Sequence, residues 1–150
     1  MASSRTLVDV LDAVERFHHH LGEFYGGLIG RASREDARIF LDLLRRHELD
    51  RARSISRYKD GAEPDVLSTW IQFSPSVELT EGWQLGDFEP DISVQRLTDL
   101  AVGYDRRLKR YLRVITDGAS QPRLNRALRK LVELEEMTDA AILAESGRMN

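Results

Sequence analysis

The sequence predicts an all-α protein, an antiparallel four-helix bundle in one domain with a single long crossover between the second and third helices. Four segments place apolar residues at alternating steps of four and three, which line up on one face of a helix. Short linkers join the first two segments and the last two, whereas residues 59–92, between the pairs, have no helical periodicity. Two helical hairpins joined by one long connection give this topology, and 150 residues are enough for one such domain.

The first helix is expected at about 4–29 and the second at about 33–58. One face of the first helix is formed by Leu7, Leu11, Val14, His18, Leu21, Tyr25 and Leu28. Ser33 opens the second helix in the stretch S-R-E-D, which resembles a capping sequence, and D-G-A-E-P ends it. Because only a few residues separate the two helices, they should form an antiparallel hairpin.

The third helix is expected at about 93–117 and the fourth at about 121–146. Asp117-Gly118 ends the third helix, and S-Q-P suits the start of the fourth. The face of the third helix consists of Leu97, Ala101, Tyr104, Leu108, Tyr111 and Ile115. The face of the fourth consists of Leu124, Leu128, Leu131, Glu135, Thr138 and Ile142.

The crossover, 59–92, contains three of the four prolines and both tryptophans. A connection of this length inside a compact domain usually has a task of its own. A short amphipathic helix is expected around 66–71, ended by Ser74-Pro75, and a peripheral strand pair within 77–88 is an alternative for the later part. The aromatic residues should cover the bundle, or else line a substrate pocket or a dimer interface: Trp70, Phe73, Trp83 and Phe88.

The composition, 41% hydrophobic and 31% charged with a net charge of −3, is typical of an ordinary globular protein. Basic residues alternate with acidic ones, which argues against binding to nucleic acid or to an anionic membrane. No apolar run is long enough for a transmembrane helix. The absence of cysteine excludes disulfides, thiolate metal ligands and a catalytic thiol. With no signal-peptide core near the N-terminus, the cytoplasm is the expected location.

Each helix interrupts its apolar face near its middle with polar side chains. The interrupting residues are Glu15, His18, His47, Asp50, Tyr104, Asp105, Glu135 and Thr138. In an antiparallel bundle of similar helices the midpoints lie at one level, so these groups should meet in one layer. A buried carboxylate is costly unless it is paired or binds a metal. The layer should therefore be a metal site, a hydrogen-bonded network or a site of acid–base chemistry.

Four stretches carry a resemblance to a known family: AVERFHHHLGEFYGG, RIFLDLLRRHELDRA, LAVGYDRRLKRY and ALRKLVELEEMTDAAI. They resemble the helices of the ferritin-like superfamily, and rubrerythrin-type bundles in particular. Such bundles place a Glu on the first helix, Glu-x-x-His on the second, a Glu on the third and Glu-x-x-His on the fourth. The resemblance implies that Glu15 and Glu135 match two ligand positions. It also implies that His47 and Asp50 replace the Glu and His of the second helix.

At the two remaining positions Tyr104 stands for the third-helix Glu, unless Asp105 substitutes, and Thr138 replaces the fourth-helix His. The lack of cysteine rules out the rubredoxin-like domain of typical rubrerythrins. The candidate metal ligands are therefore Glu15, His18, His47, Asp50 and Glu135, with His19, Tyr104 and Asp105 as helpers. The expected ion is Fe, Mn or Zn at a non-standard site, or there is none. If iron binds, the resemblance implies oxygen or peroxide chemistry; any small-molecule substrate stays open.

Two alternatives remain open. In the first, the chain is a metal-free bundle that serves as a structural or protein-interaction module and forms a homodimer through its helix faces or the crossover. Glu15 would then be a boundary residue in an ion pair, and His47 and Asp50 a structural pair held by an arginine. Arginine side chains folded into the polar layer would favour this alternative. In the second, a haem lies between His18 and His47.

Overall fold

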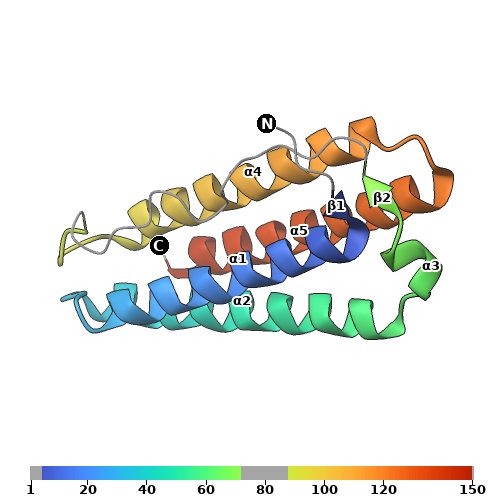
Figure 1. Cartoon of the computed structure of the whole chain (residues 1–150). Helices are drawn as coiled ribbons and strands as arrows, with labels where there is room; N and C mark the ends of the chain where they lie inside the picture. Colours follow the sequence, from blue (N-terminus) through green and yellow to red (C-terminus); the bar gives the residue numbers. More distant parts are fainter. Residues whose placement is uncertain (1–4, 72–87, 150) are drawn as a thin grey trace.

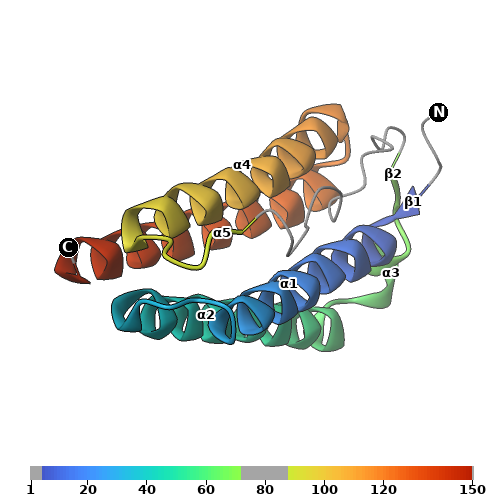
Figure 2. The same cartoon turned by 90° about the vertical axis from the view of Figure 1, so that its left-hand side faces the viewer.

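The computed structural model describes residues 5–71 and 88–149, and its four long helices agree with the predicted bundle (Figure 1). The long helices are α1 Leu7–Ile29, α2 Glu35–Gly61, α4 Val94–Gly118 and α5 Pro122–Met149. Three short elements accompany them: β1 Arg5–Thr6, α3 Pro64–Leu67 and β2 Trp70–Ile71. The α1–α2 hairpin forms one layer and the α4–α5 hairpin the other, as the two views show (Figures 1 and 2).

Local sequence determines where the helices begin. The backbone N–H of Thr6 donates a hydrogen bond to the Asp9 carboxylate (3.0 Å) and so caps the start of α1. At α4 the Ser93 hydroxyl accepts a hydrogen bond from the backbone N–H of Arg96 (3.1 Å), the usual role of a serine N-cap. The backbone N–H of Ser33 donates to the Pro90 carbonyl (2.7 Å), which ties the α1–α2 turn to the segment that leads into α4.

Two glycines bring α1 and α2 close together. A Cβ atom added at Gly22 would lie 3.4 Å from Leu49 Cδ2 and 3.5 Å from Glu48 Cβ. At Gly26 it would lie 3.2 Å from Arg45 Cδ, which is tighter than ordinary packing. These two glycines therefore mark where α1 packs against Glu48, Leu49 and Arg45 of α2.

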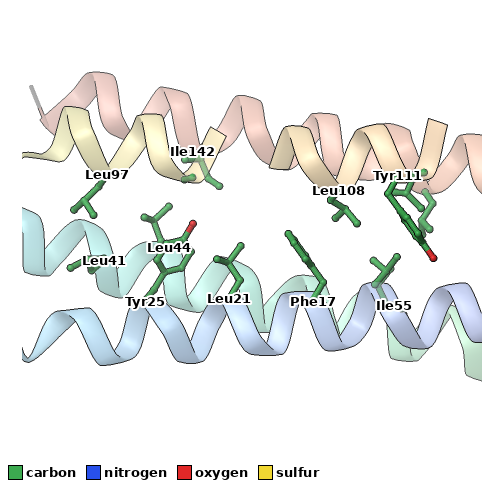
Figure 3. Close-up of a cluster of buried hydrophobic side chains, with 14 of the residues drawn as sticks. Phe17, Leu21, Tyr25, Leu41, Leu44, Ile55, Leu97, Leu108, Tyr111 and Ile142 are labelled. Atoms are coloured by element: carbon green, nitrogen blue, oxygen red, sulfur yellow. The ribbon is translucent and has the colours of Figure 1, made fainter. Parts of the chain in front are cut away.

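The apolar core lies between the two hairpins. Figure 3 shows Phe17, Leu21 and Tyr25 of α1 projecting toward α4 and α5, with side chains of all four long helices packed around them. Every residue of the face predicted for the first helix is buried. Of the faces predicted for the third and fourth helices, only Tyr104 and Thr138 are not fully buried.

The crossover differs from its prediction. The helix expected around 66–71 ends at Leu67, and Trp70–Ile71 instead pairs antiparallel with Arg5–Thr6. The Leu7 N–H bonds the Thr69 carbonyl (3.0 Å) and so continues this pairing. Ile71 and Phe88 are buried against the bundle, whereas the Trp70 side chain is 64% exposed and does not cover it.

Some expectations for the crossover, including the strand pair within 77–88 and the places of Phe73 and Trp83, fall wholly or largely outside the described residues. Within the described ranges, none of the helices combines the length and the hydropathy that crossing a membrane requires.

Candidate functional site

A buried layer of charged side chains crosses the middle of the bundle, and His18 of α1 is at its centre. The imidazole is fully buried. Its Nδ1 lies 2.6 Å from Glu48 Oε2 and its Nε2 lies 2.8 Å from Glu135 Oε1. Burial lowers the pKa of His18, but the carboxylates of Glu135 and Glu48 outweigh it and raise the pKa to about 9. At neutral pH the imidazolium therefore donates a hydrogen bond from each ring nitrogen.

The residues that α2 contributes to the layer are Glu48 and Arg51, which are 1% and 7% exposed. The expectation that His47 and Asp50 face the interior is wrong. The buried face of α2 runs through Phe40 and Leu44 to Glu48. The predicted face ran from Leu43 to His47 and so lay one residue earlier in the sequence. Each residue of a helix is rotated by about 100° from the last, so this one-residue difference turns the predicted pair toward the flank of the helix.

Arg51 binds carboxyl groups on three helices. Its Nη1 lies 3.2 Å from Glu48 Oε1, 3.0 Å from Asp105 Oδ1 of α4 and 3.5 Å from Glu135 Oε2 of α5. Its Nη2 lies 3.4 Å from Asp139 Oδ1, also of α5. Although burial lowers the pKa of the guanidinium, these carboxylates raise it above its ordinary value. Arg51 therefore remains a cation and joins one hairpin to the other.

The far side of the layer consists of Asp105, Asp139 and Lys109. Burial and a hydrogen bond with Asp139 raise the pKa of Asp105 to about 9, although the Arg51 guanidinium opposes the shift. Burial alone would raise the pKa of Asp139, but its hydrogen bonds with Asp105 and Lys109 lower it. Lys109 Nζ lies 2.6 Å from Asp139 Oδ2. At neutral pH a protonated Asp105 thus donates to an ionised Asp139.

The layer pairs each of its basic side chains with carboxyl groups. Three cations, His18, Arg51 and Lys109, face three carboxylates, and the remaining carboxyl, Asp105, is protonated. The carboxylates are those of Glu48, Glu135 and Asp139. At Glu135, burial is outweighed by His18 and Arg51, which lower the pKa of the carboxyl. A paired network of this kind avoids the large cost of an unpaired charge in a poorly solvated interior.

One further polar group borders the layer. The ring of Tyr25 is 1% exposed, and its hydroxyl has no hydrogen-bond partner among the described residues. Burial and the nearby carboxyls of Glu48 and Asp105 raise its pKa well above the usual value. The Tyr25 hydroxyl therefore stays protonated next to the network.

Comparisons with known proteins bear on the fold. No protein-family model matches the sequence, and no curated protein matches it. Among solved structures, the chain is similar to a candidate ferritin-like diiron-carboxylate protein from Thermotoga maritima, determined at 2.30 Å resolution. The TM-score is 0.66 at 13% sequence identity, and the match covers 100% of both chains. The fold is ferritin-like. At this identity the similarity shows the fold alone.

Of the five predicted metal ligands, this ferritin-like bundle brings two together, His18 and Glu135. Glu15 lies on α1 beside the buried face, and its carboxylate is 3.0 Å from Lys59 Nζ. The Asp50 side chain is 72% exposed and 3.2 Å from Arg53 Nη1. His47 is half-buried and borders a cavity between α2 and α5.

Of the residues predicted to assist the metal ligands, some lie in the layer and others do not. Asp105, the predicted substitute for Tyr104, is in the layer, whereas Tyr104 is half-buried and packs edge-on against Phe24 (5.9 Å between ring centroids). Thr138 bonds the backbone carbonyl of Leu134, and His19 is exposed. Both ring nitrogens of His18 are engaged by carboxylates, so this histidine has no nitrogen free for a haem iron.

Sequence reasoning missed Glu48, Arg51, Lys109 and Asp139. The signal for two of them was present, because Glu48-Leu-Asp-Arg51 has the spacing of the second-helix Glu-x-x-His with arginine in the place of histidine. Asp139 directly follows Thr138, the residue predicted to face the layer. As at His47 and Glu48, the prediction was therefore displaced by one residue along the helix. Nothing in the local sequence indicated that Lys109 reaches Asp139 on the next helix.

The donor set does not fit a di-iron centre. Arginine has no lone pair for a metal, and its guanidinium occupies the space between carboxyl groups of three helices. The carboxylate oxygens that would bind a cation face Arg51 or the imidazolium of His18. Among the residues that the structure describes, no three His, Asp or Glu side chains are placed to hold a metal ion.

Proposed function

We propose that this protein is a metal-free ferritin-like bundle that acts as a structural or protein-interaction module. The observation that carries the proposal is the position of the Arg51 guanidinium, 3.0 Å from Asp105 Oδ1 and 3.2 Å from Glu48 Oε1 in the centre of the polar layer. A cation fixed there supplies the positive charge that the buried carboxylates need. The layer then serves to join the helices rather than to bind an ion.

Several contacts of the layer run between the hairpins. His18 of α1 bonds Glu135 of α5, and Arg51 of α2 bonds Asp105 of α4 and Asp139 of α5. Buried charge pairs of this kind are retained in some proteins because they specify one arrangement of the helices. We therefore expect the network to set the register of one hairpin against the other.

Iron-dependent oxygen or peroxide chemistry, the function that the family resemblance suggested, receives no support from these side chains. A divalent cation would have to displace a guanidinium and an imidazolium from their carboxylates, and both would repel it.

Metal content tests the proposal. The protein is expressed with added Fe, Mn and Zn and compared by elemental analysis with a Glu48→Ala/Glu135→Ala variant, and its melting temperature is measured with and without each metal. We expect substoichiometric metal in both proteins and no stabilisation, because a ligand raises the melting temperature only if it binds the folded state. Near-stoichiometric metal that disappears in the variant would overturn the proposal.

A further inference from the structure

The outer face of α5 carries apolar side chains that the described part of the chain leaves uncovered. Leu134 is 42% exposed and Met137 is 71% exposed. With the exposed Ala141 they follow each other at steps of three and four, so they lie on one face of the helix. This stripe (Leu134, Met137, Ala141) borders a cavity of about 370 Å³ between α2 and α5, whose opposite wall includes Ile55.

Charged residues of opposite sign flank the stripe on the same face. Lys130 precedes Leu134 by one helical turn, and Glu145 follows Ala141 by one turn. Lys130 is exposed and forms no ion pair with any residue in the ranges 5–71 and 88–149. Glu145 pairs with Arg148 of its own helix, in an exposed contact that a competing partner can replace at little cost.

This face is complementary to itself. If two α5 helices pack antiparallel about a two-fold axis between Met137 and Thr138, positions equally far from the axis face each other. Leu134 then lies opposite the partner's Ala141, a large residue against a small one, and Met137 lies opposite the partner's Thr138. Lys130 lies opposite the partner's Glu145, so unlike charges meet at both ends of the stripe.

We propose that this face of α5 is the contact between two copies of the chain, packed antiparallel around that axis. A two-fold interface must present the same patch on both subunits, and the stripe meets this requirement in shape and in charge. Methionine suits such a contact because its flexible side chain adapts to an irregular space, here the cavity beside α2. The proposal names a partner for the interaction role proposed above and does not depend on the metal content.

The first experiment measures the oligomeric state of the full chain by sedimentation equilibrium over a micromolar-to-millimolar range. We expect a reversible dimer. Met137→Glu should raise its dissociation constant by at least about tenfold, because it buries a charge in the contact. Leu143→Glu is the matched control, since Leu143 is 51% exposed on the same helix but on another face, and it should dimerise like the wild type.

Charge exchange tests the antiparallel register. Lys130→Glu and Glu145→Lys should each weaken the dimer about fivefold, the effect of losing an exposed ion pair, and the double variant should recover it.

Disulfide formation tests the same register. Because the chain has no cysteine, the Leu134→Cys and Ala141→Cys variants each contain a single thiol. A mixture of the two should form a disulfide faster than either alone.

Several results would overturn this interface. A wild-type monomer at every concentration would do so, as would a dimer that Leu143→Glu dissociates and Met137→Glu does not. Loss of the dimer in the Lys130→Glu/Glu145→Lys double variant would exclude the antiparallel register. None of these outcomes bears on the metal measurement, so failure of the interface and failure of the metal-free proposal can be told apart.

Discussion

Replacing Arg51 by methionine is the most direct test of the buried layer. The methionine side chain fills part of the same space but leaves the carboxyls of Glu48, Asp105, Glu135 and Asp139 without the guanidinium that all four now face. Removing one partner of a buried charge network typically costs about 3–5 kcal/mol, because the remaining charges stay desolvated. For a chain of 150 residues this loss corresponds to a fall of about 6–20 °C in melting temperature.

The measurement is urea denaturation followed by far-ultraviolet circular dichroism at pH 7, together with a thermal melt. Arg53→Met is the matched control, because Arg53 lies on the same helix but its side chain is 67% exposed in a surface pair with Asp50. That pair should contribute less than about 1 kcal/mol. Lowering the pH to about 5 should restore part of the stability of Arg51→Met, since the unpaired carboxyls can then take up protons. Equal losses in the two variants would refute the argument that Arg51 holds the layer together.

Two further predictions concern protonation. Asp105→Asn should change the free energy of unfolding at pH 7 by less than about 1 kcal/mol, because a carboxyl whose pKa is raised to about 9 is already neutral; a loss like that of Arg51→Met would contradict this. His18 has its pKa raised from 6.5 to about 9 in the folded state, so its contribution is full below pH 6.5 and is lost as the pH rises to 9. Urea titrations across this range should show wild-type stability falling more steeply than that of His18→Gln, by a total of about 3 kcal/mol. Parallel curves would mean that His18 is neutral in the folded protein.

Two of the buried polar residues, one on α1 and one on α5, could be predicted from the sequence alone. His18 of α1 and Glu135 of α5 could be predicted because each interrupts a regular apolar face, His18 between Val14 and Leu21 and Glu135 between Leu131 and Ile142. A polar residue on an apolar face can be recognised within one helix. Because an unpaired buried charge is costly, such a residue indicates that a partner lies on another helix.

The inner face of α2 could not be determined in the same way. Leu43 and Leu44 are both apolar, so the periodicity allows either His47 and Asp50 or Glu48 and Arg51 to face inward. The structure places Glu48 and Arg51 inside, and α2 packs against α1 with Glu48 beside Gly22 and Arg45 beside Gly26. Helical periodicity gives the rotation of a helix within the bundle only to within the width of its apolar face.

The sequence alone therefore determined four helices, their hairpin pairing, the long crossover and a polar layer at mid-height. Only the tertiary structure decided what the layer is. It placed Arg51 between carboxyls of three helices, brought Lys109 to Asp139 and buried Asp105 enough to keep it protonated. These three contacts depend on the distances between helices and on the exclusion of water. The spacing of residues along one helix determines neither the distances nor the exclusion.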